Sequence, residues 1–115
     1  LLASLTNSQA ERGLELARLC QLKGIPSACG GYYTSAVPDR LTEAFTSVLA
    51  GEAEDTLPAF LDDLQQRRPL AHYRSAGNNP AASWPSPRLD LLADLSPYHY
   101  LPVQATRGCR YNCSF

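Results

Sequence analysis

The sequence of 115 residues contains no methionine, no long apolar stretch and no basic leader. A chain without methionine does not begin at its own initiation codon, and this one opens inside the apolar run 1–3. We therefore expect both ends to be cuts in a longer protein. A membrane-spanning helix needs about 18 or more consecutive apolar residues, and a secretory signal peptide needs a basic N-terminal region. Neither is predicted here.

The sequence also lacks an excess of charge of either sign. It has 10 lysine and arginine residues against 11 aspartate and glutamate residues, for a net charge of −1. Such a chain has no electrostatic attraction for nucleic acid or for an anionic membrane, so neither is expected as a partner. Four cysteines without a signal peptide favour metal binding or free thiols in a reducing compartment over disulfides. We therefore predict a cytoplasmic protein.

Short apolar runs alternate with segments of helical periodicity through the first 74 residues. The strands are predicted at 1–5, 25–29, 46–50 and 70–74, and the helices at 9–23, 39–45 and 57–67. Strands buried on both faces read as continuous apolar runs, and their alternation with helices is typical of a parallel sheet. The predicted class is therefore α/β, with a three-layer, doubly wound parallel sheet of the flavodoxin or Rossmann type, present in part.

Capping residues set the predicted helix boundaries. Asn7 or Ser8 can cap the first helix through a side-chain oxygen, and Gly24 is typical of the position after its end. Thr56 is the predicted cap of the helix at 57–67. The buried face of that helix is predicted to consist of Leu57, Phe60, Leu61 and Leu64.

Two consecutive glycines, Gly30 and Gly31, follow the second predicted strand, and residues 32–34 are expected to continue the same loop. Ligands of open α/β sheets bind in the crevice at the carboxyl ends of the strands. Glycine there lets a ligand approach the backbone closely. A loop that uses two glycines only for its own turn is an equally good interpretation of this pair.

The composition changes after residue 74. Residues 75–101 carry several prolines together with glycine, serine and asparagine, which is typical of a linker, and a short helix is predicted within them at 89–95. A short strand is predicted at 103–106. We therefore predict a domain at 1–74, a linker at 75–101 and the start of a second domain at 102–115.

The last ten residues place Cys109 and Cys113 four positions apart, with Phe115 two positions further on. Iron–sulfur clusters are held by cysteine thiolates. Structural zinc sites also use closely spaced cysteine pairs, but they need a second pair, which only Cys20 and Cys29 could supply. A zinc-stabilised interaction domain is therefore one alternative for this chain.

The whole run 106–115, Thr-Arg-Gly-Cys-Arg-Tyr-Asn-Cys-Ser-Phe, resembles the start of the radical S-adenosylmethionine signature, C-x-x-x-C-x-aromatic-C. The third cysteine would be the residue after Phe115. Arg110 stands where this family usually has proline. Further upstream, Gly30-Gly31, Pro38-Asp39 and Gly51-Glu52-x-Glu54 follow one another in the order found in radical S-adenosylmethionine enzymes with a cobalamin-binding domain.

This resemblance implies a set of cofactors and site residues. Cys109 and Cys113 would bind irons of a 4Fe–4S cluster, S-adenosylmethionine would bind the remaining iron, and Phe115 would pack beside its adenine. Residues 1–74 would be the carboxyl-terminal half of the cobalamin-binding domain, and the strand at 103–106 would be the first strand of the radical S-adenosylmethionine barrel. The residues expected to contact the nucleotide tail of cobalamin are Ser4, Thr6, Gly30 and Gly31.

The function implied is that of a radical S-adenosylmethionine enzyme that transfers methyl groups with cobalamin. Its partners would be a small-molecule substrate, an electron donor and the remainder of its own chain. The 115 residues alone are expected to be inactive, because two thiolates cannot hold a site built for three. A flavodoxin-like module that binds a small ligand without radical chemistry is the other alternative.

Overall fold

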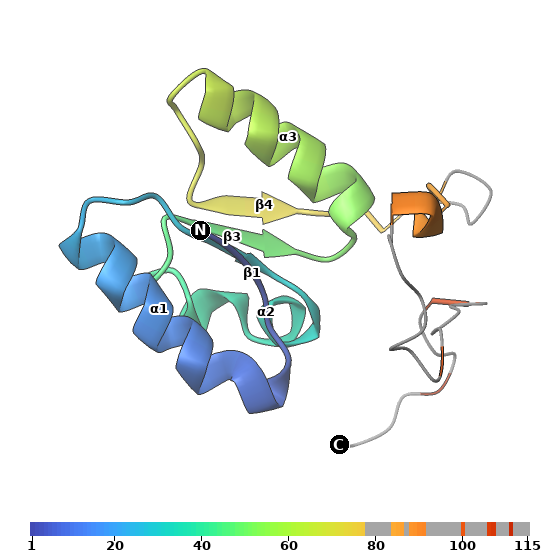
Figure 1. Cartoon of the computed structure of the whole chain (residues 1–115), viewed down its shortest axis with the longest axis horizontal. Coiled ribbons are helices and arrows are strands. Elements are labelled where there is room, and N and C mark those ends of the chain that lie inside the picture. The colour runs from blue at the N-terminus through green and yellow to red at the C-terminus, as the bar shows by residue number, and fades with distance from the viewer. Residues whose placement is uncertain (78–83, 87, 92–99, 101–105, 108–110, 112–115) are drawn as a thin grey trace. The chain divides into compact units, whose positions relative to one another are not determined.

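The structure is a computed structural model that describes residues 1–77, 84–86, 88–91, 100, 106–107 and 111. The chain divides into two compact units, Leu1–Asn79 and Pro80–Phe115. The first unit is an α/β structure and holds all of the strands that the structure describes (Figure 1). Across the described residues, none of the helices has the length and apolar character that crossing a membrane requires.

Four parallel strands form the sheet of the first unit, in the spatial order β1-β2-β3-β4. They are β1 Leu2–Ser4, β2 Ala28–Gly30, β3 Ser47–Ala50 and β4 His72–Arg74. All four predicted strands are thereby confirmed, although each is shorter than predicted. The second begins three residues late because the Ile25 N–H still donates to Cys20 O at the end of the preceding helix, and Pro26 has no N–H to offer a neighbouring strand.

The helix that follows β1 is α1, Ala10–Leu22. As predicted, Gly24 lies just after the end of the helix, with a φ of +63° in the left-handed region. The predicted cap at Asn7 or Ser8 is wrong, because Asn7–Gln9 form a 3-10 turn, η1, that leads into the helix without a side-chain cap. The buried residues of α1 are Ala10, Gly13 and Ala17.

The segment after β2 is helical where a loop was predicted. Tyr32–Ala36 form α2, and the Thr34 hydroxyl donates to Gly30 O at 2.9 Å within its first turn. The helix predicted at 39–45 is instead a 3-10 turn, η2, over Pro38–Arg40, followed by turns. The Leu41 N–H donates to Pro38 O, three residues back, which is the tighter hydrogen-bond spacing of a 3-10 helix.

The helix α3 spans Ala53–Gln65 and begins four residues before the predicted start. Thr56 was predicted to cap it, but its hydroxyl lies inside the helix and donates to Glu52 O at 3.0 Å. A threonine within a helix commonly bonds the carbonyl four residues back in this way. Leu61 was predicted to face the core and is 43% exposed, because the buried face follows Thr56 and Phe60 instead.

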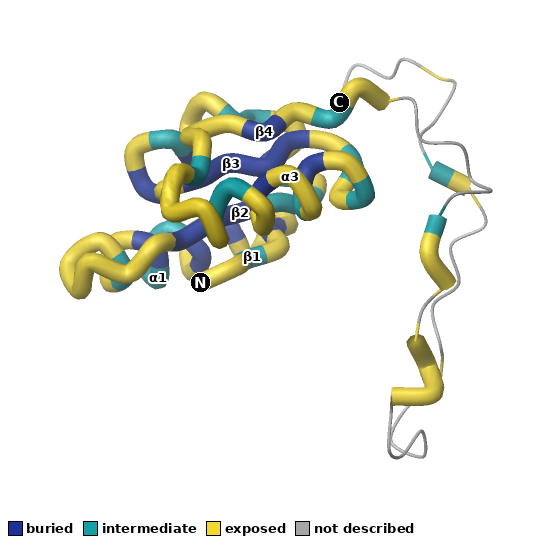
Figure 2. The backbone as a smooth tube through the Cα atoms, turned by 90° about the horizontal axis from the view of Figure 1, so that it is seen from above, coloured by how far each residue is buried: buried dark blue, intermediate teal, exposed yellow. Residues whose placement is uncertain are grey.

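Helices cover both faces of the sheet, with α1 and α3 on opposite sides (Figure 1). Figure 2 shows β3 buried along its whole length, as expected for a strand covered from both sides. One core cluster contains Leu5, Ala17, Cys29, Leu41, Ala44, Phe45 and Val48. The other contains Ala28, Leu49, Phe60 and Tyr73, in which the Phe60 and Tyr73 rings meet edge to face at 5.7 Å.

The predicted α/β class is therefore confirmed. A four-stranded, all-parallel sheet between helices is compatible with a flavodoxin-like or Rossmann-like fold. In the second unit, Leu89–Leu91 form a 3-10 turn, η4, at the start of the helix predicted at 89–95. Residues 92–95 and the strand predicted at 103–106, apart from Thr106, lie outside the described residues. The predicted boundaries after residues 74 and 101 stay predictions.

Candidate functional site

A cavity of about 140 Å³ opens in the first unit at the carboxyl ends of β1, β2 and β3, beside the start of α3. Carboxyl ends of parallel strands are where open α/β sheets bind their ligands. A cavity of roughly 150 Å³ is large enough for a benzene ring. The residues that line it are Leu2, Ala3, Ser4, Gly30, Gly31, Leu49, Gly51, Ala53, Thr56 and Leu57.

Gly30 ends β2 and Gly31 follows it, and the two positions require glycine for different reasons. Gly31 has a φ of +95°, and a Cβ there would lie 2.8 Å from Leu5 O and 2.9 Å from Leu5 N, so the backbone excludes any side chain. Gly30 has no such constraint, since its Cβ would meet Leu49 O at an ordinary 3.6 Å. The loop interpretation therefore accounts for Gly31. The same interpretation does not account for Gly30. There, the absence of a side chain keeps the cavity open.

The structure brings three of the predicted cobalamin-contacting residues together, because Ser4, Gly30 and Gly31 all line this cavity. Thr6 is not among the lining residues. Its hydroxyl donates to Gln9 Oε1 at 3.0 Å and lies 3.2 Å from Ser8 Oγ, so it stabilises the turn before α1. The proposed contacts of all four residues with cobalamin stay predictions.

Sequence reasoning missed the wall of the cavity formed by β3 and α3. Gly51 follows β3 just as Gly31 follows β2, and its φ of +92° marks a turn that needs glycine. This third glycine at a strand end was a signal that the sequence offered. Leu49 and Leu57 carried no such signal, because apolar residues of a strand and a helix are expected in the core whether or not they line a cavity.

Within the residues that the structure describes, the cysteines of the first unit belong to no cluster of possible metal ligands. Cys29 is fully buried among apolar side chains, and this burial raises the pKa of its thiol to about 11, although a hydrogen bond with Thr34 opposes the shift. A thiol that resists ionisation is a poor ligand, because metals bind the thiolate. In the part of the chain that the structure describes, no group of three or more histidine, cysteine or acidic residues could hold a metal ion.

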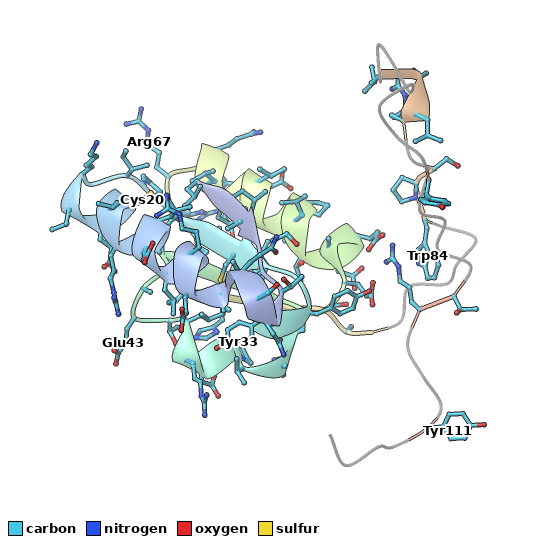
Figure 3. All side chains as sticks on the ribbon, turned by 60° about the horizontal axis from the view of Figure 1, so that its bottom comes forward. Cys20, Tyr33, Glu43, Arg67, Trp84 and Tyr111 are labelled. Carbon is cyan, nitrogen blue, oxygen red and sulfur yellow. The ribbon has the colours of Figure 1, made fainter. Side chains whose placement is uncertain are left out.

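The predicted cluster ligands Cys109 and Cys113, and Phe115, lie outside the described residues. Their roles stay predictions. Within the second unit, the guanidinium carbon of Arg107 lies 4.1 Å from the centroid of the Trp84 ring (Figure 3), which is a cation–π contact. This contact joins the predicted linker to a residue two positions before Cys109.

No family model matches the chain, and no solved structure is significantly similar to it. Among curated proteins, an uncharacterized methyltransferase from Synechocystis is 35% identical over 89 residues, which cover 76% of this chain and 16% of that protein. The bacteriochlorophyllide d C-8(2)-methyltransferase of Chlorobaculum tepidum is 26% identical over 113 residues, which cover 93% of this chain and 25% of that protein. The chain thus spans between a sixth and a quarter of the length of these relatives, and both are methyltransferases.

We predict that alanine is tolerated at Gly30 and not at Gly31. Gly31→Ala should lower the free energy of unfolding by about 1–3 kcal/mol from its backbone conformation alone, with a further loss from the close approach to Leu5. Gly30→Ala should change it by less than about 1 kcal/mol. Urea unfolding followed by circular dichroism measures both. Equal losses in the two variants would contradict the assignment of separate roles.

The buried thiol of Cys29 predicts a loss of stability in alkali. Its pKa is about 11 in the folded chain against an ordinary value of 9.0, so the folded state holds its proton more tightly. The stabilisation is complete below pH 9 and declines as the pH rises from 9 to 11, by about 2 kcal/mol in all. Unfolding measured in reductant at pH 8 and pH 11 should show this decline in wild type and in Cys20→Ala.

Between pH 8 and pH 11, the free energy of unfolding of Cys29→Ala should fall by about 2 kcal/mol less than that of wild type, because the variant lacks the thiol that titrates. Any contribution of Tyr73, whose burial also raises the pKa of its phenol, is common to all three chains and cancels in the comparison. If the free energy of unfolding falls equally with pH in Cys29→Ala and in wild type, burial does not raise the pKa of the Cys29 thiol.

Proposed function

We propose that this chain is part of a radical S-adenosylmethionine methyltransferase that uses cobalamin, with the first unit binding cobalamin and the last residues binding an iron–sulfur cluster. The observation that carries the proposal is the cavity, which gathers Ser4, Gly30 and Gly31 at the carboxyl ends of a parallel sheet. The similarity to two methyltransferases, each several times longer than this chain, supports methyl transfer by a larger protein.

The residues of the cavity fit the planar base of the nucleotide tail of cobalamin. The cavity is lined mainly by apolar atoms of leucine and alanine, together with backbone of the three glycines. Flat aromatic groups bind well between apolar side chains when the backbone can approach the ring closely. Ser4 adds a hydroxyl at the edge of the site, which can donate one hydrogen bond and accept two.

Cys109 and Cys113, with a cysteine after Phe115, would hold the cluster through their thiolates. When bound, a 4Fe–4S cluster supplies the electron that cleaves S-adenosylmethionine, and cobalamin carries the methyl group. The chain's own contribution would be to hold the nucleotide tail in the cavity and to place Phe115 beside the adenine. An electron donor and a small-molecule substrate complete the set of proposed partners.

The relative from Chlorobaculum tepidum acts on bacteriochlorophyllide d, by its name. The substrate of the present chain does not follow from that name. We propose only that a small molecule accepts the methyl group.

A second candidate function is a small-ligand binding module that needs no cysteine chemistry. It is favoured by the position of the cavity, which is lined entirely by residues of the first unit. Binding of a ligand to that unit would therefore be independent of Cys109 and Cys113. The two candidates differ in whether the longer protein holds iron.

We predict that the chain binds hydroxocobalamin through the cavity, as measured by titration of its visible absorption. Gly30→Val places a branched side chain in the cavity without requiring a left-handed backbone, and should weaken binding at least about tenfold, which is about 1.4 kcal/mol. Ala76→Val is the matched control, because Ala76 is exposed and does not line the cavity. Unchanged affinity in a folded Gly30→Val chain would remove the cavity from the cobalamin proposal.

For the cluster, we predict that anaerobic reconstitution of the longer protein with iron and sulfide loads a 4Fe–4S cluster. Cys109→Ala and Cys113→Ala should each abolish its absorption and its electron paramagnetic resonance signal, since each removes one thiolate. Cys20→Ala is the control, because Cys20 lies on α1 of the first unit. A cluster that survives both substitutions, or cobalamin binding without any iron, would favour the small-ligand module.

A further inference from the structure

Two parts of the cavity wall lie beyond the residues that the sheet pairs. One wall is Gly31, after β2, and the other is Gly51 with the first turn of α3, after β3. The register between the two strands runs from Ala28 opposite Ser47 to Cys29 opposite Val48. Gly31 and Gly51 lie beyond its last pair, so ladder hydrogen bonds do not set the distance between them.

A single hydroxyl spans this gap. Ser35 Oγ donates to Gly31 O at 3.0 Å and accepts a hydrogen bond from the Gly51 N–H at 2.9 Å. A serine hydroxyl has one proton to donate and two lone pairs to accept with, so it can make both bonds at once. Ser35 lies on α2, and its own N–H also donates to Gly31 O. The hydroxyl is therefore held firmly against one wall while it reaches the other.

The second wall is anchored on its far side. The Ser75 N–H donates to Ala50 O at 2.9 Å, and the Ser75 hydroxyl donates to Asp55 Oδ2 in the first turn of α3. A Cβ on Gly51 would come within 2.7 Å of Ser75 Cβ, so this turn packs tightly against the chain after β4. Ser75 thus fixes one side of the turn at Gly51. The hydrogen bond from the Gly51 N–H to Ser35 Oγ then determines how close this turn lies to Gly31.

We propose that Ser35 is a positioning residue that sets the width of the cavity by tying Gly31 to Gly51, and so sets the affinity for a planar ligand base. This role rests on the proposed function only for the identity of the ligand. Ser35 is exposed and takes no part in either core cluster. Removing its hydroxyl therefore leaves no hole in the core. Weaker binding of a ligand would come from the loss of the hydrogen bonds that join Gly31 to Gly51.

The first test follows the hydrogen bond between the Gly51 N–H and Ser35 Oγ in the absence of any ligand. Ser35→Ala should exchange its Gly51 amide hydrogen faster than wild type, because the amide loses its acceptor. Ser35→Thr keeps the hydroxyl and should stay close to wild type. Ser8→Ala is the matched control, since Ser8 is an exposed serine of the turn before α1. If the Gly51 amide exchanges at the wild-type rate in Ser35→Ala, the proposal is overturned.

The second test measures affinity with hydroxocobalamin and with free benzimidazole, a two-ring planar probe. Ser35→Ala should raise Kd for both by about tenfold, the equivalent of one hydrogen bond, whereas Ser35→Thr and Ser8→Ala should stay within about twofold. Faster Gly51 exchange with unchanged affinity would show that the bridge does not set the cavity width, and would overturn the role.

The two tests separate this role from the proposed function. If wild type binds benzimidazole and not hydroxocobalamin, the cobalamin proposal fails, while the effect of Ser35→Ala on benzimidazole still decides the role of Ser35. If wild type binds neither ligand, the proposed function and the affinity part of the role both fall.

Discussion

The arrangement of the first unit depends on the absence of a side chain at residue 31. Gly31 has a left-handed backbone whose Cβ would press against the backbone of Leu5. At that place Leu5 N–H donates to Gly30 O, and Leu5 O accepts from the Tyr33 N–H. The end of β1, the end of β2 and the start of α2 therefore meet where nothing projects from the chain. The cavity opens beside this meeting point, so the fold and the site share one steric constraint.

Much of the fold could be predicted because burial leaves a regular pattern in sequence. The strands are short apolar runs, and α1 shows helical spacing with a glycine after its end. The helix α2 could not be predicted in this way. Its five residues lack an apolar period, and the carbonyls of Gly30 and Gly31 stabilise it by accepting hydrogen bonds from Thr34 and Ser35.

The start of α3 was mispredicted because the same threonine oxygen can serve either of two purposes. Thr56 before Leu57-Pro58 reads as a cap in the sequence, whereas the folded chain uses its hydroxyl to bond Glu52 O. Moving the start by four residues carries Ala53 to the edge of the cavity. Small errors in helix boundaries therefore matter most at strand ends, where helix starts form part of the site.

The site could be predicted in part. Gly30 and Gly31 follow from their place after a strand, and Ser4 follows from the resemblance to a known family. The opposite wall depends on which face of β3 is turned toward α3, and that is decided by tertiary packing. The cysteines near the carboxyl end were identified by the resemblance of the run 106–115 to a family signature, and their role as cluster ligands is a proposal.

The stacking of Arg107 on Trp84 has a practical consequence for studying the two units. Trp84 is the single tryptophan of the sequence, and it belongs to the second unit, whereas the first unit has tyrosine as its brightest chromophore. Light absorbed at the red edge of the protein spectrum therefore excites the second unit alone. Its emission provides a built-in optical reporter of the segment that leads to the cysteines, unmixed with signals from the sheet.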